Sequence, residues 1–110
     1  IEILLRNASE QEVPIMAFVG NPGMIQIHTG YVKNIQMMGE WVNVMDSEFN
    51  LHLRQDLIAS VWHVIKPTED GDVNSVEVYD ADNELIVQFF GKRKPGNPER
   101  EDWRKLLVLF

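Results

Sequence analysis

Hydrophobic and polar residues alternate at every second position through much of the chain. The segments 24–29, 41–46 and 73–80 show this alternation most clearly. A period of two is typical of β-strands that bury one face. Turn-forming residues separate the strands, as in "GNPG" at 20–23 and "PTEDGD" at 67–72. Because such connections are too short for parallel crossovers, the pattern predicts a large antiparallel meander.

The period changes to a helical one at the C-terminal end. Asn97 is a good helix N-cap and Pro98 suits the first helical position, with acidic residues following in the first turn. Apolar residues then recur at helical spacing and form one stripe, which predicts an amphipathic helix packed on the sheet. The stripe consists of Trp103, Leu106, Leu107 and Phe110.

The N-terminal residues 1–13, "IEILLRNASEQEV", resemble the tail of a helix. We therefore predict the α+β class, with a large antiparallel meander sheet, a C-terminal helix packed on it and the tail of an N-terminal helix. The length of 110 residues is that of one domain, spanning 1–110. Since the start lacks an initiator Met and the features of a signal peptide, we expect the chain to be a fragment of a longer protein.

Composition excludes several classes of function. The formal net charge is −7, with 10 Lys and Arg residues in total, which argues against nucleic acid as a partner. No apolar run approaches the ~18 residues of a membrane helix, so membrane insertion is not expected. The chain has no cysteine, which excludes disulfides, thiolate metal sites and cysteine nucleophiles.

The histidines and the loops carry no recognised catalytic or metal motif. His28, His52 and His63 have no metal-ligand spacing, and a structural role on polar strand faces is the simpler interpretation. "GNPG" lacks the continuation of a phosphate-binding loop, and we interpret it as a tight hairpin turn. "TEDGD" lacks the ligand spacing of a calcium loop, so a solvated hairpin tip is expected.

The stretch "VQFFGKRKPGNP" at 87–98 clusters three cations after an apolar strand of an acidic chain. Alternation places Ile86, Gln88 and Phe90 on one face of that strand and Leu85, Val87 and Phe89 on the other. Two interpretations stay open from the residues alone. The cations either solubilise a strand end, or they bind the anionic edge of a flat apolar ligand that lies on Phe90, with Arg93 turned toward it.

Several long stretches, in order along the chain, carry a more specific signal than any single motif. Among them are "FVGNPGMIQIHTG", "VKNIQMMGEWVNVMDSEFNLHLR" and "FFGKRKPG". Over roughly residues 13 to 107, the chain resembles the C-terminal half of the cytoplasmic haemin-transport and haemin-degradation proteins of the HemS/ChuS type. The resemblance implies two similar halves, each a large antiparallel sheet with flanking helices, and haem as the cofactor. It also implies a role in cytoplasmic haem handling after uptake.

The resemblance also implies haem contacts at matching positions. In relatives, the strand that matches "IMAFVGN" supplies apolar contacts to haem. A lysine before "PT" lies near a propionate, and a further strand contributes Gln, an aromatic residue and Arg. Relatives commonly have Tyr at the position of Phe90 and Cys at the position of Met24. The expected haem-binding residues are Met16, Phe18, Lys66, Gln88, Phe90 and Arg93.

No metal ligand is expected within this chain. The family's axial histidine lies upstream, and a distal arginine comes from the other half. We therefore expect the chain to supply part of a haem site. The alternatives are a haem-degrading oxygenase activity that releases iron, and a dimerisation or docking domain without a ligand. Expected partners are haem, a haem oxygenase or haem importer, and a second half-domain or homodimer partner.

Overall fold

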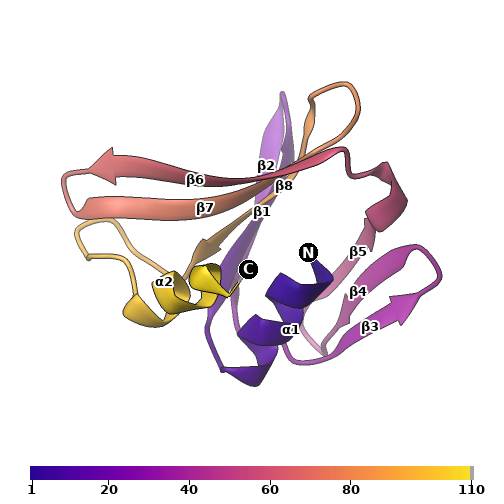
Figure 1. Ribbon diagram of the computed structural model, residues 1–110, viewed down its shortest axis with the longest axis horizontal. Coiled ribbons are helices and arrows are strands. Elements are labelled where there is room, and N and C mark those ends of the chain that lie inside the picture. Colours follow the sequence, from indigo (N-terminus) through magenta and orange to yellow (C-terminus); the bar gives the residue numbers. More distant parts are fainter. Residues whose placement is uncertain (110) are drawn as a thin grey trace.

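The computed structural model describes residues 1–109 and confirms the α+β class. Two α-helices and two antiparallel sheets enclose a common core, and these two helices lie on one side of the larger sheet (Figure 1). No helix in the described range is long and apolar enough to cross a membrane. The helices are α1 (Glu2–Glu10), the short 3-10 helix η1 (Gln55–Leu57) and α2 (Glu101–Val108).

The eight strands divide between two sheets, whereas the alternation alone predicts one large meander. The five-stranded sheet has the order β2-β1-β8-β7-β6, so that the first strand of the chain pairs with the last. Its strands are β1 (Ile15–Asn21), β2 (Met24–Gly30), β6 (Ser60–Thr68), β7 (Gly71–Tyr79) and β8 (Leu85–Gly91). The three-stranded sheet is a meander of β3 (Ile35–Met38), β4 (Trp41–Met45) and β5 (Asn50–Arg54).

Both turns predicted from sequence are confirmed as hairpins. Pro22 and Gly23 connect β1 to β2, and the Asn21 side-chain oxygen accepts hydrogen bonds from the N–H groups of Gly23 and Met24, at 2.8 and 3.1 Å. The tip of the β6–β7 hairpin is residues 69–70. Short side-chain-to-backbone bonds of this kind stabilise tight turns without further packing.

One hydrophobic core lies between the five-stranded sheet, the helices and the smaller sheet. Alternate residues of the central strands point into it, as period two requires. Val87 and Phe89 of β8 are 1% and 0% exposed. From the helices, Leu4 and Leu5 join Trp103, Leu106 and Leu107.

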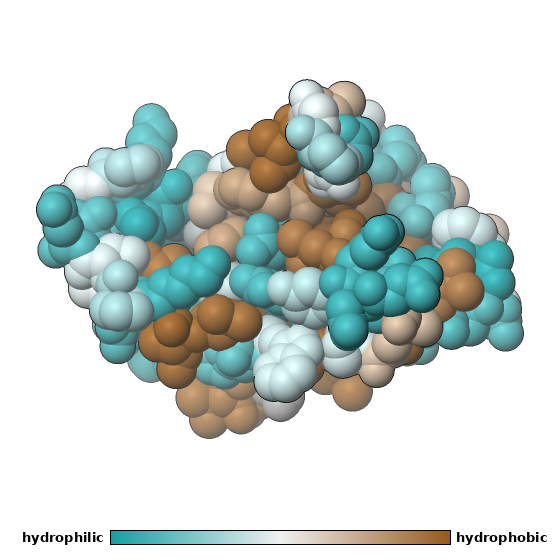
Figure 2. Space-filling view, turned by 90° about the horizontal axis from the view of Figure 1, so that it is seen from above, coloured by the Kyte–Doolittle hydropathy of each residue, from teal (hydrophilic) through white to brown (hydrophobic). Residues whose placement is uncertain are grey.

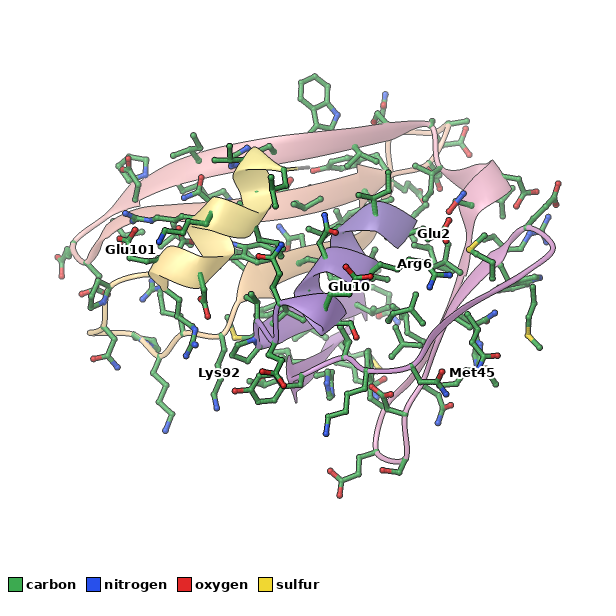
Figure 3. The ribbon with its side chains drawn as sticks, turned by 60° about the horizontal axis from the view of Figure 1, so that its bottom comes forward. Glu2, Arg6, Glu10, Met45, Lys92 and Glu101 are labelled. Carbon is green, nitrogen blue, oxygen red and sulfur yellow. The ribbon has the colours of Figure 1, made fainter. Side chains whose placement is uncertain are left out.

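The apolar stripe of α2 is confirmed for Trp103, Leu106 and Leu107, which are all buried. Phe110, the fourth residue of that stripe, lies outside the described residues. On α1, Glu2 and Arg6 lie side by side and form an ion pair of 2.7 Å (Figure 3).

The start of α2 differs from the sequence prediction. The helix begins at Glu101 with Arg100 as its N-cap, so Asn97 and Pro98 lie in the preceding loop. Glu99 takes no place in the first turn. Its carboxylate is buried against β7, where it accepts hydrogen bonds from Asn74.

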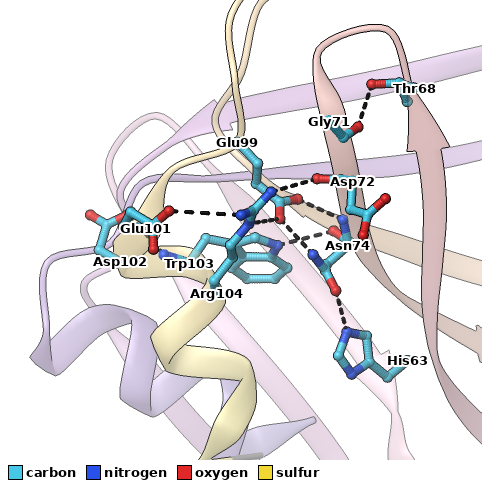
Figure 4. Close-up of polar contacts among 10 residues, drawn as sticks. All are labelled: His63, Thr68, Gly71, Asp72, Asn74, Glu99, Glu101, Asp102, Trp103 and Arg104. Carbon is cyan, nitrogen blue, oxygen red and sulfur yellow. Dashed lines mark hydrogen bonds and ion pairs between the residues drawn. The ribbon is translucent and has the colours of Figure 1, made fainter.

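A buried polar network joins α2 to β6 and β7 (Figure 4). The two oxygens of Glu99 accept hydrogen bonds of 2.6 Å from the backbone N–H and the side-chain amide of Asn74. Glu99 also accepts a bond from Arg104 Nε at 3.0 Å, and the Trp103 indole donates to the Asn74 carbonyl at 3.0 Å. On the far side, the ring of His63 is 2.7 Å from the Asn74 side-chain oxygen. These contacts hold α2 on the sheet by polar as well as apolar groups.

Gly91 is required where α2 crosses the end of β8. A Cβ atom at this position would lie 2.6 Å from Trp103 Cγ and 2.7 Å from Trp103 Cβ, and Trp103 is itself fully buried. We expect Gly91→Ala to lower the free energy of unfolding by about 1–3 kcal/mol, because overpacking forces the core apart. Urea unfolding of the intact protein measures this change.

The matched control for Gly91→Ala is Gly23→Ala. A Cβ atom there meets only the Asn21 side-chain oxygen at 3.5 Å, which is an ordinary contact, so little loss is expected. Equal destabilisation by the two variants would contradict the role given to the Gly91–Trp103 contact.

Candidate functional site

The five-stranded sheet has a second face, turned away from the core. We call it the open face, and define it by the outward residues of its three central strands. Figure 2 views the molecule from the side on which β6 and β7 lie at the top of Figure 1. On this side, hydrophobic surface is interspersed with hydrophilic groups. The residues of the open face are Met16, Phe18, Ser75, Glu77, Gln88 and Phe90.

Strand pairing brings four of the expected haem-binding residues together on this face. Met16 of β1 lies opposite Phe90 of β8, and Phe18 lies opposite Gln88. The ring centroids of Phe18 and Phe90 are 5.1 Å apart, with an angle of 51° between the ring planes. All four side chains are half-buried, so each keeps some surface available for contact.

A groove of about 520 Å³ opens beside this pair of rings. Phe18 and Gln88 line one side of it, and Met24, Ile25 and Leu85 contribute apolar side chains. Ile25 and Met24 are more than half exposed, at 57% and 59%. The open face is therefore an apolar surface that continues into a groove rather than an enclosed cavity.

Sequence reasoning missed a buried carboxylate on the open face. Glu77 of β7 lies opposite Gln88 and is 7% exposed. Gln88 donates a hydrogen bond to it at 2.8 Å, and the Tyr79 hydroxyl donates another at 2.6 Å. Ser75 adds a longer bond of 3.3 Å. Alternation marks Glu77 only as an outward residue, so its burial depends on neighbouring strands that the pattern does not specify.

The pKa of Glu77 reflects two opposing effects. Burial disfavours its charge and by itself raises the pKa of the carboxyl group. Hydrogen bonds from Tyr79 and Gln88, with the nearby charge of Lys66, outweigh burial and leave the pKa below its ordinary value. The hydrogen bond that the Tyr79 hydroxyl donates to Glu77 also raises the pKa of Tyr79. Glu77 is thus a carboxylate at neutral pH.

Lys66 reaches the same group of residues from β6. Its ammonium nitrogen is 3.9 Å from a carboxylate oxygen of Glu77, and the side chain is 59% exposed. A pair of this length on an exposed side chain is loose. Lys66 is therefore close to the open face and able to change partner.

Arg93 is held at a different place. Its Nη1 donates to Asp70 at the β6–β7 tip at 3.1 Å and to the carbonyls of Lys94 and Asn97 at 3.4 and 3.3 Å. Its side chain is 17% exposed. The structure thus connects Arg93 to the loop before α2 and leaves it outside the Glu77 network. Its neighbour Lys92 is exposed beyond the end of β8 (Figure 3).

The three histidines lie in separate surroundings. His52 contacts Asn43, at 2.6 Å, and His63 contacts Asn74. The ring of His28 stacks on Phe49, with ring centroids 3.7 Å apart, and joins the two sheets. Burial lowers the pKa of His28, although the nearby charge of Asp46 acts to raise it. Among residues 1–109, no group of His, Asp and Glu side chains is arranged to hold a metal ion.

A second groove of about 500 Å³ lies away from the open face, between β5, η1 and the β7–β8 turn. Trp41, Arg54 and Leu57 contribute to its walls. The Arg54 guanidinium lies over the Trp41 ring at 5.3 Å and forms an ion pair with Asp56. None of the residues expected to bind haem lines this groove.

The whole chain matches the model of a known family. Residues 1–110 fit the model of the haemin-degrading HemS.ChuX domain. The chain belongs to this family. The assignment confirms the resemblance drawn from the sequence stretches.

Curated relatives agree with the family assignment. The chain is 42% identical over 105 residues to the hemin transport protein HmuS of Yersinia pestis, covering 96% of this chain and 30% of HmuS. It is 43% identical over 101 residues to the hemin transport protein HemS of Yersinia enterocolitica, covering 92% of this chain and 29% of HemS. The chain therefore spans about a third or less of these relatives.

Solved structures extend the likeness to three dimensions. PhuS of Pseudomonas aeruginosa, described as a heme-binding protein, is 55% identical with a TM-score of 0.97, over 99% of this chain and 32% of PhuS. ChuS of Escherichia coli O157:H7, described as a heme degrading enzyme, is 39% identical with a TM-score of 0.94, over 98% of this chain and 32% of ChuS. ChuX, at 9% identity and a TM-score of 0.80, shows the shared fold alone.

Proposed function

We propose that the open face forms one wall of a haem site, in a protein that binds and carries haem during bacterial iron acquisition in the cytoplasm. The observation that carries the proposal is the Phe18–Phe90 pair beside an exposed apolar groove. A flat porphyrin gains most of its binding energy from burial against such surfaces. The holo form of PhuS, the 55% identical relative, is described as a heme-binding protein, which supports this choice of ligand.

The residues present fit a planar ligand with two anionic groups. Met16, Phe18 and Phe90 offer apolar contact, and Gln88 offers an amide at the same face. Lys66 offers a cation that is loosely paired. Phe90 retains the ring stacking expected of a tyrosine at that position without a phenol hydroxyl.

Bound haem supplies the iron chemistry, and this chain positions and shields it. The axial ligand is expected from a segment outside the chain. Lys66 and Arg93 would neutralise the propionates. For Arg93, the three described bonds use Nη1, which leaves the Nη2 group for a propionate.

Arg93→Ala is expected to weaken haem binding only about 1.5- to 5-fold, because partly exposed ion pairs contribute ~0.2–1 kcal/mol. The shape of the Soret band should stay nearly unchanged. Haem titration of the intact protein measures both. Lys94→Ala, at an exposed neighbour, is the control and should change neither. A large change of the Soret band in Arg93→Ala would show instead that Arg93 acts near the iron.

Haem degradation is a second candidate function, since ChuS is described as a heme degrading enzyme and is 39% identical to this chain. The test supplies the intact protein with haem, a reductant and catalase. A biliverdin-like product formed with catalase present would indicate oxygenase turnover. Product that forms only without catalase would indicate peroxide-driven breakdown, and the carrier function would stand.

A docking domain without a ligand is the remaining alternative. Val61, Trp62 and Ile65 on the edge strand β6 are all exposed, at 39%, 59% and 58%. Exposed apolar edge strands favour pairing with another chain or a second half-domain. Failure of the intact protein to develop a Soret band on haem titration would favour this alternative over haem binding.

A further inference from the structure

Glu77 is an unusual residue for an apolar ligand face. It projects from the same face as Phe18 and Phe90, yet its side chain is 9% exposed. A buried carboxylate costs free energy unless it is paired and hydrogen-bonded. Its partners come from three adjacent strands. They are Lys66 of β6, Ser75 and Tyr79 of β7, and Gln88 of β8.

Two of these partners are residues that the proposed function assigns to the haem. Gln88 donates one amide N–H to Glu77, which fixes the orientation of its side chain. Lys66 is drawn toward Glu77 and across the open face. Gln88 therefore takes its position from Glu77, whereas Lys66 is attracted to Glu77 only loosely.

The charge of Glu77 also acts on whatever lies on the open face. In a site from which water is excluded, a fixed charge interacts more strongly than the same charge in solvent. A negative charge beside haem stabilises ferric iron relative to ferrous iron, because the ferric state carries one more positive charge.

We propose that Glu77 is a positioning residue of the haem site, which holds Gln88 at the open face, attracts Lys66 toward it and favours the ferric state of the bound haem. This inference rests on the proposed function. It gives the chain a role in setting the reduction potential of the haem, in addition to forming one wall of the haem site. A carrier that keeps haem ferric limits the reaction of its cargo with oxygen.

The test is the reduction potential of haem bound to the intact protein. Glu77→Gln keeps the size and an acceptor oxygen while removing the charge, so the potential should rise. Glu84→Gln is the matched control. Glu84 lines the groove beside Gln88 but is exposed, where water and salt screen its charge, so its shift should be smaller.

Lys66→Gln provides a second variant that does not endanger folding, because Lys66 is exposed. Removing its positive charge leaves Glu77 uncompensated, so the potential should fall. Shifts of opposite sign in the Glu77 and Lys66 variants support the inference. Equal shifts in Glu77→Gln and Glu84→Gln, or no fall in Lys66→Gln, would overturn it while leaving haem binding intact. A wild-type protein that binds no haem would instead overturn the proposed function, and this inference with it.

Discussion

Replacing Phe18 and Phe90 together by alanine is expected to weaken haem binding by the intact protein at least tenfold. Burying a large apolar side chain contributes ~1.5–3 kcal/mol, and a loss of ~1.4 kcal/mol is a tenfold change in affinity. The two rings are half-buried and face the same surface, so a porphyrin lying on them would cover both. Haem titration followed at the Soret band gives the dissociation constants.

Phe49→Ala is the matched control for this double variant. Phe49 is also half-buried, but its ring stacks on His28 between the two sheets. Haem affinity should therefore be unchanged, although some stability is lost. Affinity that falls less than twofold in the Phe18 and Phe90 double variant would place the porphyrin elsewhere.

Glu99→Ala is expected to lower the free energy of unfolding by about 2–4 kcal/mol, because buried donors left without an acceptor cost ~1–3 kcal/mol each. Two donors of Asn74, its backbone N–H and its side-chain amide, would lose their acceptor together. Urea unfolding of the intact protein measures the change.

The matched control is Glu101→Ala, which removes a carboxylate two residues away. It should have little effect on the free energy of unfolding. The side chain of Glu101 is 75% exposed, and its only described ion pair is with Arg104, over a distance of 3.7 Å. A loss as large in Glu101→Ala as in Glu99→Ala would contradict the role of the buried network.

Strand alternation predicted the faces of β8 correctly from Val87 to Phe90 but not at its start, where Leu85 is 43% exposed and Ile86 packs against the core. Val87 and Phe89 are buried in the core, while Gln88 and Phe90 point outward. This success has a simple cause, since side chains of a strand alternate whatever the partner strands are. The two tight hairpins followed from their turn residues for a similarly local reason.

The start of α2 could not be predicted because a long-range contact overrides the local signals. Asn97 and Pro98 are good N-terminal residues by propensity, but Glu99 is drawn into hydrogen bonds with Asn74 on β7. In the structure the helix begins after that contact, at Glu101. A partner 25 residues away is invisible to any local pattern.

The division into two sheets has the same origin. Pairing of β1 with β8 depends on segments separated by most of the chain, which neither periodicity nor turn length specifies. The alternation predicted the strands, whereas their assignment to sheets follows from which faces pack together in the core.

The candidate site was predicted in part. The sequence placed Met16, Phe18 and Phe90 on faces that the structure brings together. It did not find Glu77, because a Glu between two valines in a strand looks like an ordinary solvent-facing residue. Nor could it find the bond from Arg93 to Asp70, which joins a loop to a distant hairpin tip.

The most direct test of the central claim is to locate ferric haem by its paramagnetic broadening. The chain has 3 tryptophans in distinct places, so the intact protein can be labelled with 5-fluorotryptophan and assigned by Trp→Phe variants. Trp62 lies opposite Glu77 on β6, and Trp41 lines the second groove. On addition of haem, the fluorine signal of Trp62 should broaden more than that of Trp41. Broadening of Trp41 with an unchanged Trp62 signal would contradict a haem site on the open face.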